Sequence, residues 1–106
     1  MKDDILAAKF AFAKAAEVEL AEVIAYYNAE KPGLGDEFAD AVDKAIQEVV
    51  EHPHRWTIIL DDKRRYRLER FPYGLVYKIV SAKIFFLAVM HLHRDPNYWK
   101  DREKEV

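Results

Sequence analysis

Apolar residues recur every three or four positions near the start of the chain, from Lys14 to Tyr27. Glutamates fill the faces between them, which is the pattern of an amphipathic helix. The repeating positions are Ala16, Leu20, Val23, Ile24 and Tyr27. The stretch Asn28–Gly33 then supplies a proline, which cannot continue a helix, and a glycine suited to a left-handed cap. The pattern therefore predicts a first helix that ends near this stretch.

A second apolar stripe with the same period follows almost at once and stops before Pro53. Its positions are Leu34, Phe38, Val42, Ala45, Ile46 and Val49. Because the connection is short, the two helices are expected to form an antiparallel hairpin. Gly33 and Gly35 lack the preceding strand and the third glycine of a nucleotide-binding turn, so both are interpreted as helix-capping residues.

The pattern changes to period two in the second half of the chain. Tyr66 and Leu68 alternate with Arg65, Arg67 and Glu69, so one face is apolar and the other is charged. This alternation predicts a half-buried strand, and the following Phe-Pro-Tyr-Gly sequence predicts a turn or bulge.

Two β-rich runs come next, Leu75–Val80 and Ile84–Met90, joined by Ser81–Lys83. Lys9–Phe12 suits either an edge strand or the start of the first helix. The predicted fold is α+β: a two-helix hairpin packed on a twisted antiparallel sheet of three to four strands, with a polar helical tail. With 106 residues, we expect a single domain over residues 1–106.

The composition removes several classes of site. The chain has no cysteine, which excludes disulfides, thiolate metal sites and cysteine nucleophiles. Its first residues include Asp3 and Asp4 and lack a long apolar core, so we expect neither a signal peptide nor a membrane span. These features predict a cytoplasmic protein.

The charges are nearly balanced, 17 basic against 19 acidic residues, which gives no general attraction to nucleic acid. Their placement is uneven. The glutamates of the first helix, Glu17, Glu19 and Glu22, are interpreted as a solvated face. Basic residues crowd one stretch of the second half, either as a binding surface or as an ordinary solvated strand face: Arg55, Lys63, Arg64, Arg65, Arg67 and Arg70.

Histidine and tryptophan residues offer weaker alternatives. His91 and His93 lie two apart on a predicted strand face, but no third ligand of suitable spacing accompanies them, so neither a metal nor another cofactor is expected. Trp56 and Trp99 suit stacking on bases less well than covering the edges of a small core.

Three segments of the second half resemble the toxins of the RelE/ParE superfamily in order and spacing. They are Tyr66-Arg67-Leu68, the FPYGLVY sequence of residues 71–77, and Val89-Met90-His91 followed by Arg94-Asp95-Pro96. The resemblance covers nearly the whole chain. It implies a compact α+β toxin of a bacterial type II toxin–antitoxin pair, encoded beside an antitoxin whose disordered segment folds over the toxin and neutralises it.

The superfamily holds two activities. RelE-like members cleave messenger RNA on the ribosome, and ParE-like members poison DNA gyrase. Metal-free RNA cleavage needs cations at the scissile phosphate and a group that moves protons. Arg65, Arg67, Arg94 and Tyr98 resemble the RelE-like catalytic positions, and a meander would bring the last two toward the charged face of the arginine strand.

Two departures from the RelE-like pattern shift the prediction. RelE-like nucleases usually place another arginine where this chain has Gly74, and the spacing from Arg94 to Tyr98 is shorter than theirs. The FPYGLVYKI and AVMHLHRDPNYW segments resemble the ParE-like group more closely, which favours DNA gyrase as the target. A ribosome-dependent endoribonuclease and a degenerate toxin that binds only its antitoxin remain the alternatives.

Overall fold

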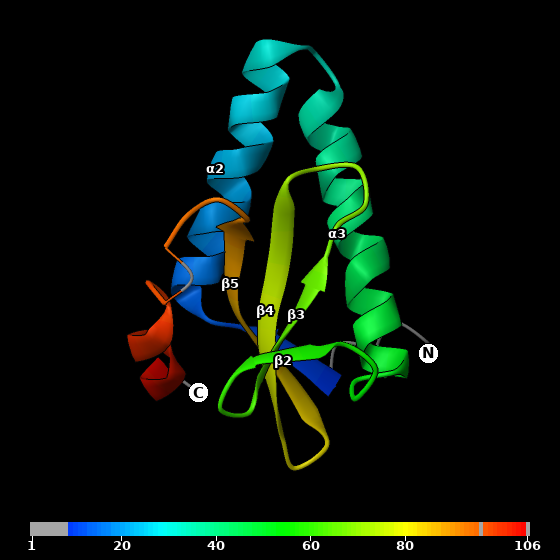
Figure 1. Cartoon of the computed structure of the whole chain (residues 1–106). Coiled ribbons are helices and arrows are strands. Elements are labelled where there is room, and N and C mark those ends of the chain that lie inside the picture. Colours follow the sequence, from blue (N-terminus) through cyan, green and yellow to red (C-terminus); the bar gives the residue numbers. More distant parts are fainter. Residues whose placement is uncertain (1–8, 96, 106) are drawn as a thin grey trace.

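Two long helices form a hairpin that covers one face of the sheet in the computed structural model, which describes residues 9–95 and 97–105 (Figure 1). Helix α2 spans Lys14–Glu30 and helix α3 spans Leu34–Glu51. The predicted hairpin is confirmed, with α2 extending beyond Tyr27. Among the described residues, no helix is long and apolar enough to cross a membrane.

The two glycines of the hairpin loop have different roles. Gly33 has φ 89° and precedes the first residue of α3, as expected for a left-handed capping glycine. The capping interpretation of Gly35 is wrong, because this residue lies inside α3 against α2. Its N–H donates to Oδ1 of Asn28 at 2.7 Å. A hydrogen atom in place of a side chain lets the two helix backbones approach here.

Five strands form one sheet in the order β1-β5-β4-β3-β2. The strands are β1 Phe10–Phe12, β2 Thr57–Leu60, β3 Lys63–Arg67, β4 Tyr73–Val80 and β5 Lys83–His91. Neighbours are antiparallel except β1 and β5, which run parallel. The α+β class is confirmed, whereas the expectation of three to four strands, all antiparallel, is wrong on both counts.

The two edge strands, β1 and β2, explain why the sheet differs from the predicted one. β1 confirms the strand alternative for Lys9–Phe12, but its parallel pairing with β5 joins residues more than seventy positions apart. β2 was not predicted, since it has four residues and two of them are exposed, so it lacks a buried alternating face. Local periodicity carries no signal for either pairing.

The core divides into two clusters on opposite faces of the sheet. The larger cluster joins the hairpin to the inward residues of the sheet, including Phe38, Leu75 and Phe86. The smaller cluster lies on the face of the sheet opposite the hairpin, which we call the open face, because Val76 alternates with Leu75 and Tyr77 along β4. Its members are Val76, Leu87, Ala88, Met90 and Trp99. The chain after β5 supplies Trp99 to this cluster and ends in a short 3-10 helix, η1, at Lys100–Glu105.

Tyr77 links the sheet to the end of the hairpin, and its ionisation is expected to lower the stability of the fold at alkaline pH. Its buried hydroxyl donates to the carbonyl of Pro53 at 2.7 Å, and burial raises its pKa from 10.0 to about 12. Because the pKa is higher in the folded state than in the unfolded state, the buried hydroxyl contributes its full stabilisation below pH 10. This contribution is lost as the pH rises toward 12.

We expect Tyr77→Phe to lower the free energy of unfolding by about 1 kcal/mol at neutral pH, through the lost hydrogen bond. The difference in free energy of unfolding between the variant and the unmodified protein should decrease above pH 10 and reach zero before pH 12, because the variant has no hydroxyl to ionise at this position. Urea unfolding at a series of pH values measures both. A gap that stays constant across this range would contradict the assignment.

Candidate functional site

Arg65 and Arg67 lie on the open face of the sheet. Arg65 pairs with Val76 and Arg67 pairs with Gly74, so both share the face of the smaller cluster. Neither guanidinium has an ion pair or hydrogen bond within the described part of the chain. The alternating pattern therefore placed these two arginines correctly on the face of β3 that points away from the hairpin.

The neighbouring arginines are engaged in the fold. Arg64 points to the helical side, where it donates to the carbonyls of His54 at 3.0 Å and Trp56 at 2.8 Å. Arg70 forms an ion pair with Glu37 of α3. The arginine-rich stretch thus contains residues with structural contacts as well as the two that face outward.

Gly74 sits beneath Arg65. A Cβ atom built on Gly74 would lie 3.0 Å from Cγ of Arg65 and 3.1 Å from the carbonyl oxygen of Tyr66. The stem of Arg65 therefore fills the space above this glycine. An arginine at position 74, as in RelE-like nucleases, requires Arg65 to adopt another path.

Arg94 and Tyr98 come together beyond the end of β5. The guanidinium carbon of Arg94 lies 3.7 Å from the centre of the Tyr98 ring, a cation–π arrangement. The Tyr98 hydroxyl donates to Oε2 of Glu19 at 2.8 Å. Burial, followed by this hydrogen bond, raises the pKa of Tyr98. The phenol is thus held protonated and directed to a carboxylate of α2.

The four residues singled out from the sequence form two pairs. Arg65 and Arg67 lie on β3, whereas Arg94 and Tyr98 follow β5, and β4 lies between these strands. Across the described residues, no hydrogen bond, ion pair or ring contact joins one pair to the other. Within the described residues, the two pairs are therefore linked only through the strands that carry them.

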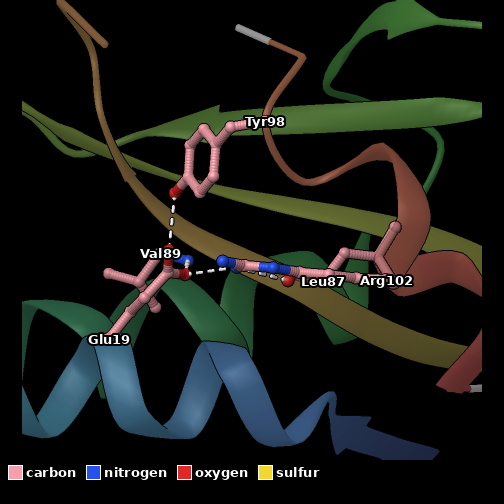
Figure 2. Close-up of polar contacts among 5 residues, drawn as sticks. All are labelled: Glu19, Leu87, Val89, Tyr98 and Arg102. Atoms are coloured by element: carbon pink, nitrogen blue, oxygen red, sulfur yellow. Dashed lines mark hydrogen bonds and ion pairs between the residues drawn. The ribbon is translucent and has the colours of Figure 1, made fainter. Parts of the chain in front are cut away.

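Glu19 is a polar centre that the sequence did not indicate. Its side chain is 13% exposed, so its interpretation as part of a solvated face is wrong. Oε1 accepts from the backbone N–H of Val89 at 3.0 Å and from Nη1 of Arg102 at 2.7 Å, and Oε2 accepts from Tyr98. Figure 2 shows these groups converging on the carboxylate. One side chain of α2 thus holds both β5 and the C-terminal segment.

A hollow of about 290 Å³ opens beside this centre, between α2 and the end of β5. Its walls carry carboxylates, aromatic rings and one cation. They include Glu19, Glu22, Tyr26, Tyr73, His91 and Arg94. A second hollow of about 190 Å³ lies between α3 and β3, beside Tyr66 and Leu68. Two separate hollows therefore flank the packed interface between the hairpin and the sheet, one along each helix.

A family model described as the ParE toxin of the type II toxin–antitoxin system parDE matches residues 10–96. The chain belongs to the ParE toxin family. It is therefore the toxin of a type II toxin–antitoxin system, and its family implies an antitoxin as its partner. The predicted RelE/ParE resemblance is confirmed by this match.

The fold agrees with the family. A chain of the solved chromosomal ParDE toxin–antitoxin system from P. aeruginosa superposes with a TM-score of 0.72, covering 80% of this chain and 96% of that one at 12% identity. At this identity the likeness concerns the fold. A comparison with curated protein sequences found no match.

The histidines and tryptophans considered in the sequence have structural contacts in the toxin. His91 ends β5, but His93 lies in the turn beyond it, so the expectation that both share a strand face is wrong. Nδ1 of His91 accepts from the backbone N–H of His93 at 3.1 Å. No group of three metal-binding side chains occurs within the described ranges. Trp99 is fully buried, and Trp56 packs edge-on against Tyr66, which supports core covering for both.

Proposed function

We propose that this ParE-family toxin arrests growth by poisoning DNA gyrase and that its antitoxin neutralises it by occupying the groove between the hairpin and the sheet. Gyrase acts on DNA in the cytoplasm, so the proposal requires the toxin to act there. The surface and the C-terminal segment of the toxin, rather than a catalytic centre, would contact the target.

The absence of a direct contact between the two pairs of candidate residues, within the described part of the chain, is the observation that supports gyrase over messenger RNA. RNA cleavage needs a proton-transferring group within hydrogen-bond reach of the reacting oxygen and cations on the same phosphate. In this chain the Tyr98 hydroxyl donates to Glu19. RelE-like nucleases have a further arginine at the position of Gly74, and in this chain the side chain of Arg65 covers that glycine. The free toxin thus presents two arginines without the proton-moving partner.

The groove supports the antitoxin part of the proposal. It combines hollows along both helices with exposed apolar and aromatic side chains, among them Tyr26 on α2. Such a groove suits either an amphipathic helix or an extended segment of a partner. Binding there would bury apolar surface together with charges.

The two arginines supply the test between targets. If the toxin poisons gyrase without catalysis, Arg65→Ala and Arg67→Ala are expected to change toxicity by less than about threefold, the small effect of removing a cation that lies outside the core and has no charged partner. A nuclease that used them would lose about 100-fold in rate for each. Growth arrest under titrated expression measures toxicity, with Arg55→Ala as a matched control from the same basic stretch.

Target identity is measured directly in the same cells by following DNA replication and message integrity separately. Early arrest of replication with intact messages, together with loss of gyrase supercoiling by purified toxin, is the expected result. Rapid cleavage of translated messages would instead establish the RelE-like endoribonuclease, the alternative favoured by the unpaired state of Arg65 and Arg67. If neither process is affected, the chain is a degenerate toxin that binds only its antitoxin.

A further inference from the structure

The outer edge of β2 has no strand partner among the described residues. The sheet runs in the order β1-β5-β4-β3-β2, so β2 is its last strand and pairs only with β3 (Figure 1). An edge strand leaves every second N–H and C=O without a partner from the sheet. Proteins often protect such an edge with a charged side chain or a proline. β2 has neither, since its sequence is Thr-Ile-Ile-Leu.

Ile58 is an exposed apolar side chain in the middle of this edge. It is 51% exposed and belongs to neither core cluster. The next two residues, Ile59 and Leu60, pack against the smaller cluster, so they already have a role in the fold. A single exposed isoleucine is ordinary on a protein surface, but here it coincides with a free strand edge. The combination indicates a surface that another strand can cover.

Opposite charges stand at the two ends of β2. Arg55 precedes the strand and Asp61 follows it, and both side chains are exposed. Neither forms an ion pair within the described part of the chain. When two copies of one strand pair antiparallel, the start of each strand lies beside the end of the other. Arg55 of one copy is then close to Asp61 of the second copy, and the two-fold axis creates this pairing twice.

A register centred on Ile58 agrees with the faces of the strand. Two strands related by a two-fold axis perpendicular to the sheet keep like faces together. Ile58 then lies opposite Ile58 of the second copy, as a β-branched cross-strand pair. Thr57, which shares the open face with Arg65, meets Ile59 of the second copy on that same face. The register shift between Ile58 and Leu60 supplies one extra residue, which brings the oppositely charged ends level.

We propose that two copies of this toxin pair through β2, antiparallel and centred on Ile58, and so join their sheets into one continuous sheet. The inference goes beyond the proposed function and does not depend on the target. A second copy is the occupant that fits, because the exposed residue at the centre pairs with itself and the charges at the ends are complementary. The interface closes at two copies, since each copy uses its only β2 edge. It is small, because β2 has four residues, so the dimer is reversible.

Pairing through β2 leaves the hollow between α2 and β5 open in each copy. Strands β3 and β4 separate β2 from β5, and the described walls of that hollow contain no residue of β2. A dimer can therefore bind one antitoxin segment on each copy. Dimerisation and the proposed neutralisation are thus separable, and the failure of one leaves the other standing.

The oligomeric state of the purified toxin tests the proposal. Sedimentation velocity from about 5 µM to about 500 µM is expected to show a shift from monomer to dimer, as for a weak interface. Ile58→Lys places two like charges opposite each other at the centre of the pair. We expect it to weaken dimerisation at least about 100-fold and so to stay monomeric across this range. An unmodified toxin that is monomeric throughout would overturn the proposal.

Val18→Lys is the matched control, because Val18 is 49% exposed and lies on α2 rather than on the sheet. This variant is expected to dimerise like the unmodified toxin. Circular dichroism of both variants shows whether the fold is kept, which is expected since both side chains are exposed. A dimer that survives Ile58→Lys, or that is lost equally in Val18→Lys, would overturn the assignment to β2.

Charge changes at the strand ends test the antiparallel arrangement. Arg55→Glu places like charges at both ends of the pair and is expected to weaken dimerisation about tenfold, whereas Arg55→Ala should weaken it by no more than about threefold. Lys44→Glu is the control, because it makes the same change in net charge on an exposed residue of α3. The effect of Arg55→Glu should decrease at high salt, which screens exposed charges. Equal dimerisation in Arg55→Glu and Lys44→Glu would overturn the antiparallel arrangement.

Discussion

Replacing Gly35 by alanine is expected to lower the free energy of unfolding by about 3 kcal/mol, the upper end of the usual range for overpacking. The added Cβ would lie 2.1 Å from the carbonyl oxygen of Ile24 and 2.6 Å from Cγ of Asn28. The first contact is with the backbone of α2, which cannot rotate away. The helices must separate, and the 2.7 Å hydrogen bond between Gly35 and Asn28 is strained or lost. Urea unfolding monitored by circular dichroism measures the loss.

Gly33→Asn, two residues earlier and just before the start of α3, is the control for this substitution. Gly33 has φ 89°, and a Cβ built there meets nothing within 4 Å, so asparagine, which tolerates left-handed backbone, should cost less than about 1 kcal/mol. A loss below about 1 kcal/mol in Gly35→Ala would contradict the close contact between the two helices at this position.

Replacing Phe38 by alanine is expected to lower the free energy of unfolding by about 4 kcal/mol. Its ring is fully buried and lies 5.6 Å from the ring of Tyr27, 5.1 Å from Phe71 and 5.3 Å from Tyr73. These partners come from α2, from the turn before β4 and from the first residue of β4, so alanine leaves a cavity where hairpin and sheet meet. Denaturant unfolding of the variant gives the loss directly.

Phe38→Leu provides the graded comparison, because leucine keeps most of the buried volume and should lose less than half as much stability. A small loss in Phe38→Ala, below about 1.5 kcal/mol, would mean that the surrounding rings collapse into the space. That outcome would contradict the rigid aromatic junction described here.

The helical hairpin and the central strands were predictable from local pattern. Every residue of the second apolar stripe except Leu34 is buried in α3, because a helix presents every third or fourth side chain to one neighbour. The alternation of Tyr66 with Arg65 and Arg67 likewise placed the two arginines on the outer face of β3. The turn before β4 was predicted too, although β4 begins at Tyr73 rather than Leu75.

The sequence did not indicate how the candidate site residues are arranged in space. The sequence singled out Arg94 and Tyr98 beside Arg65 and Arg67, yet only the first two lie in contact with each other. Where Tyr98 points depends on Glu19, and an isolated glutamate on a helix looks the same in sequence whether it is solvated or buried.

What the sequence by itself determined is therefore the set of elements with internal periodicity, the family, and the residues that face outward along one strand. What the tertiary structure decided is the parallel pairing of β1 with β5, the close crossing at Gly35, and the convergence on Glu19. The contacts of Glu19 with Val89 and Arg102 span 70 and 83 residues. Periodicity reports which face of an element is buried, whereas contacts across such separations depend on how whole elements pack, and no local pattern records that.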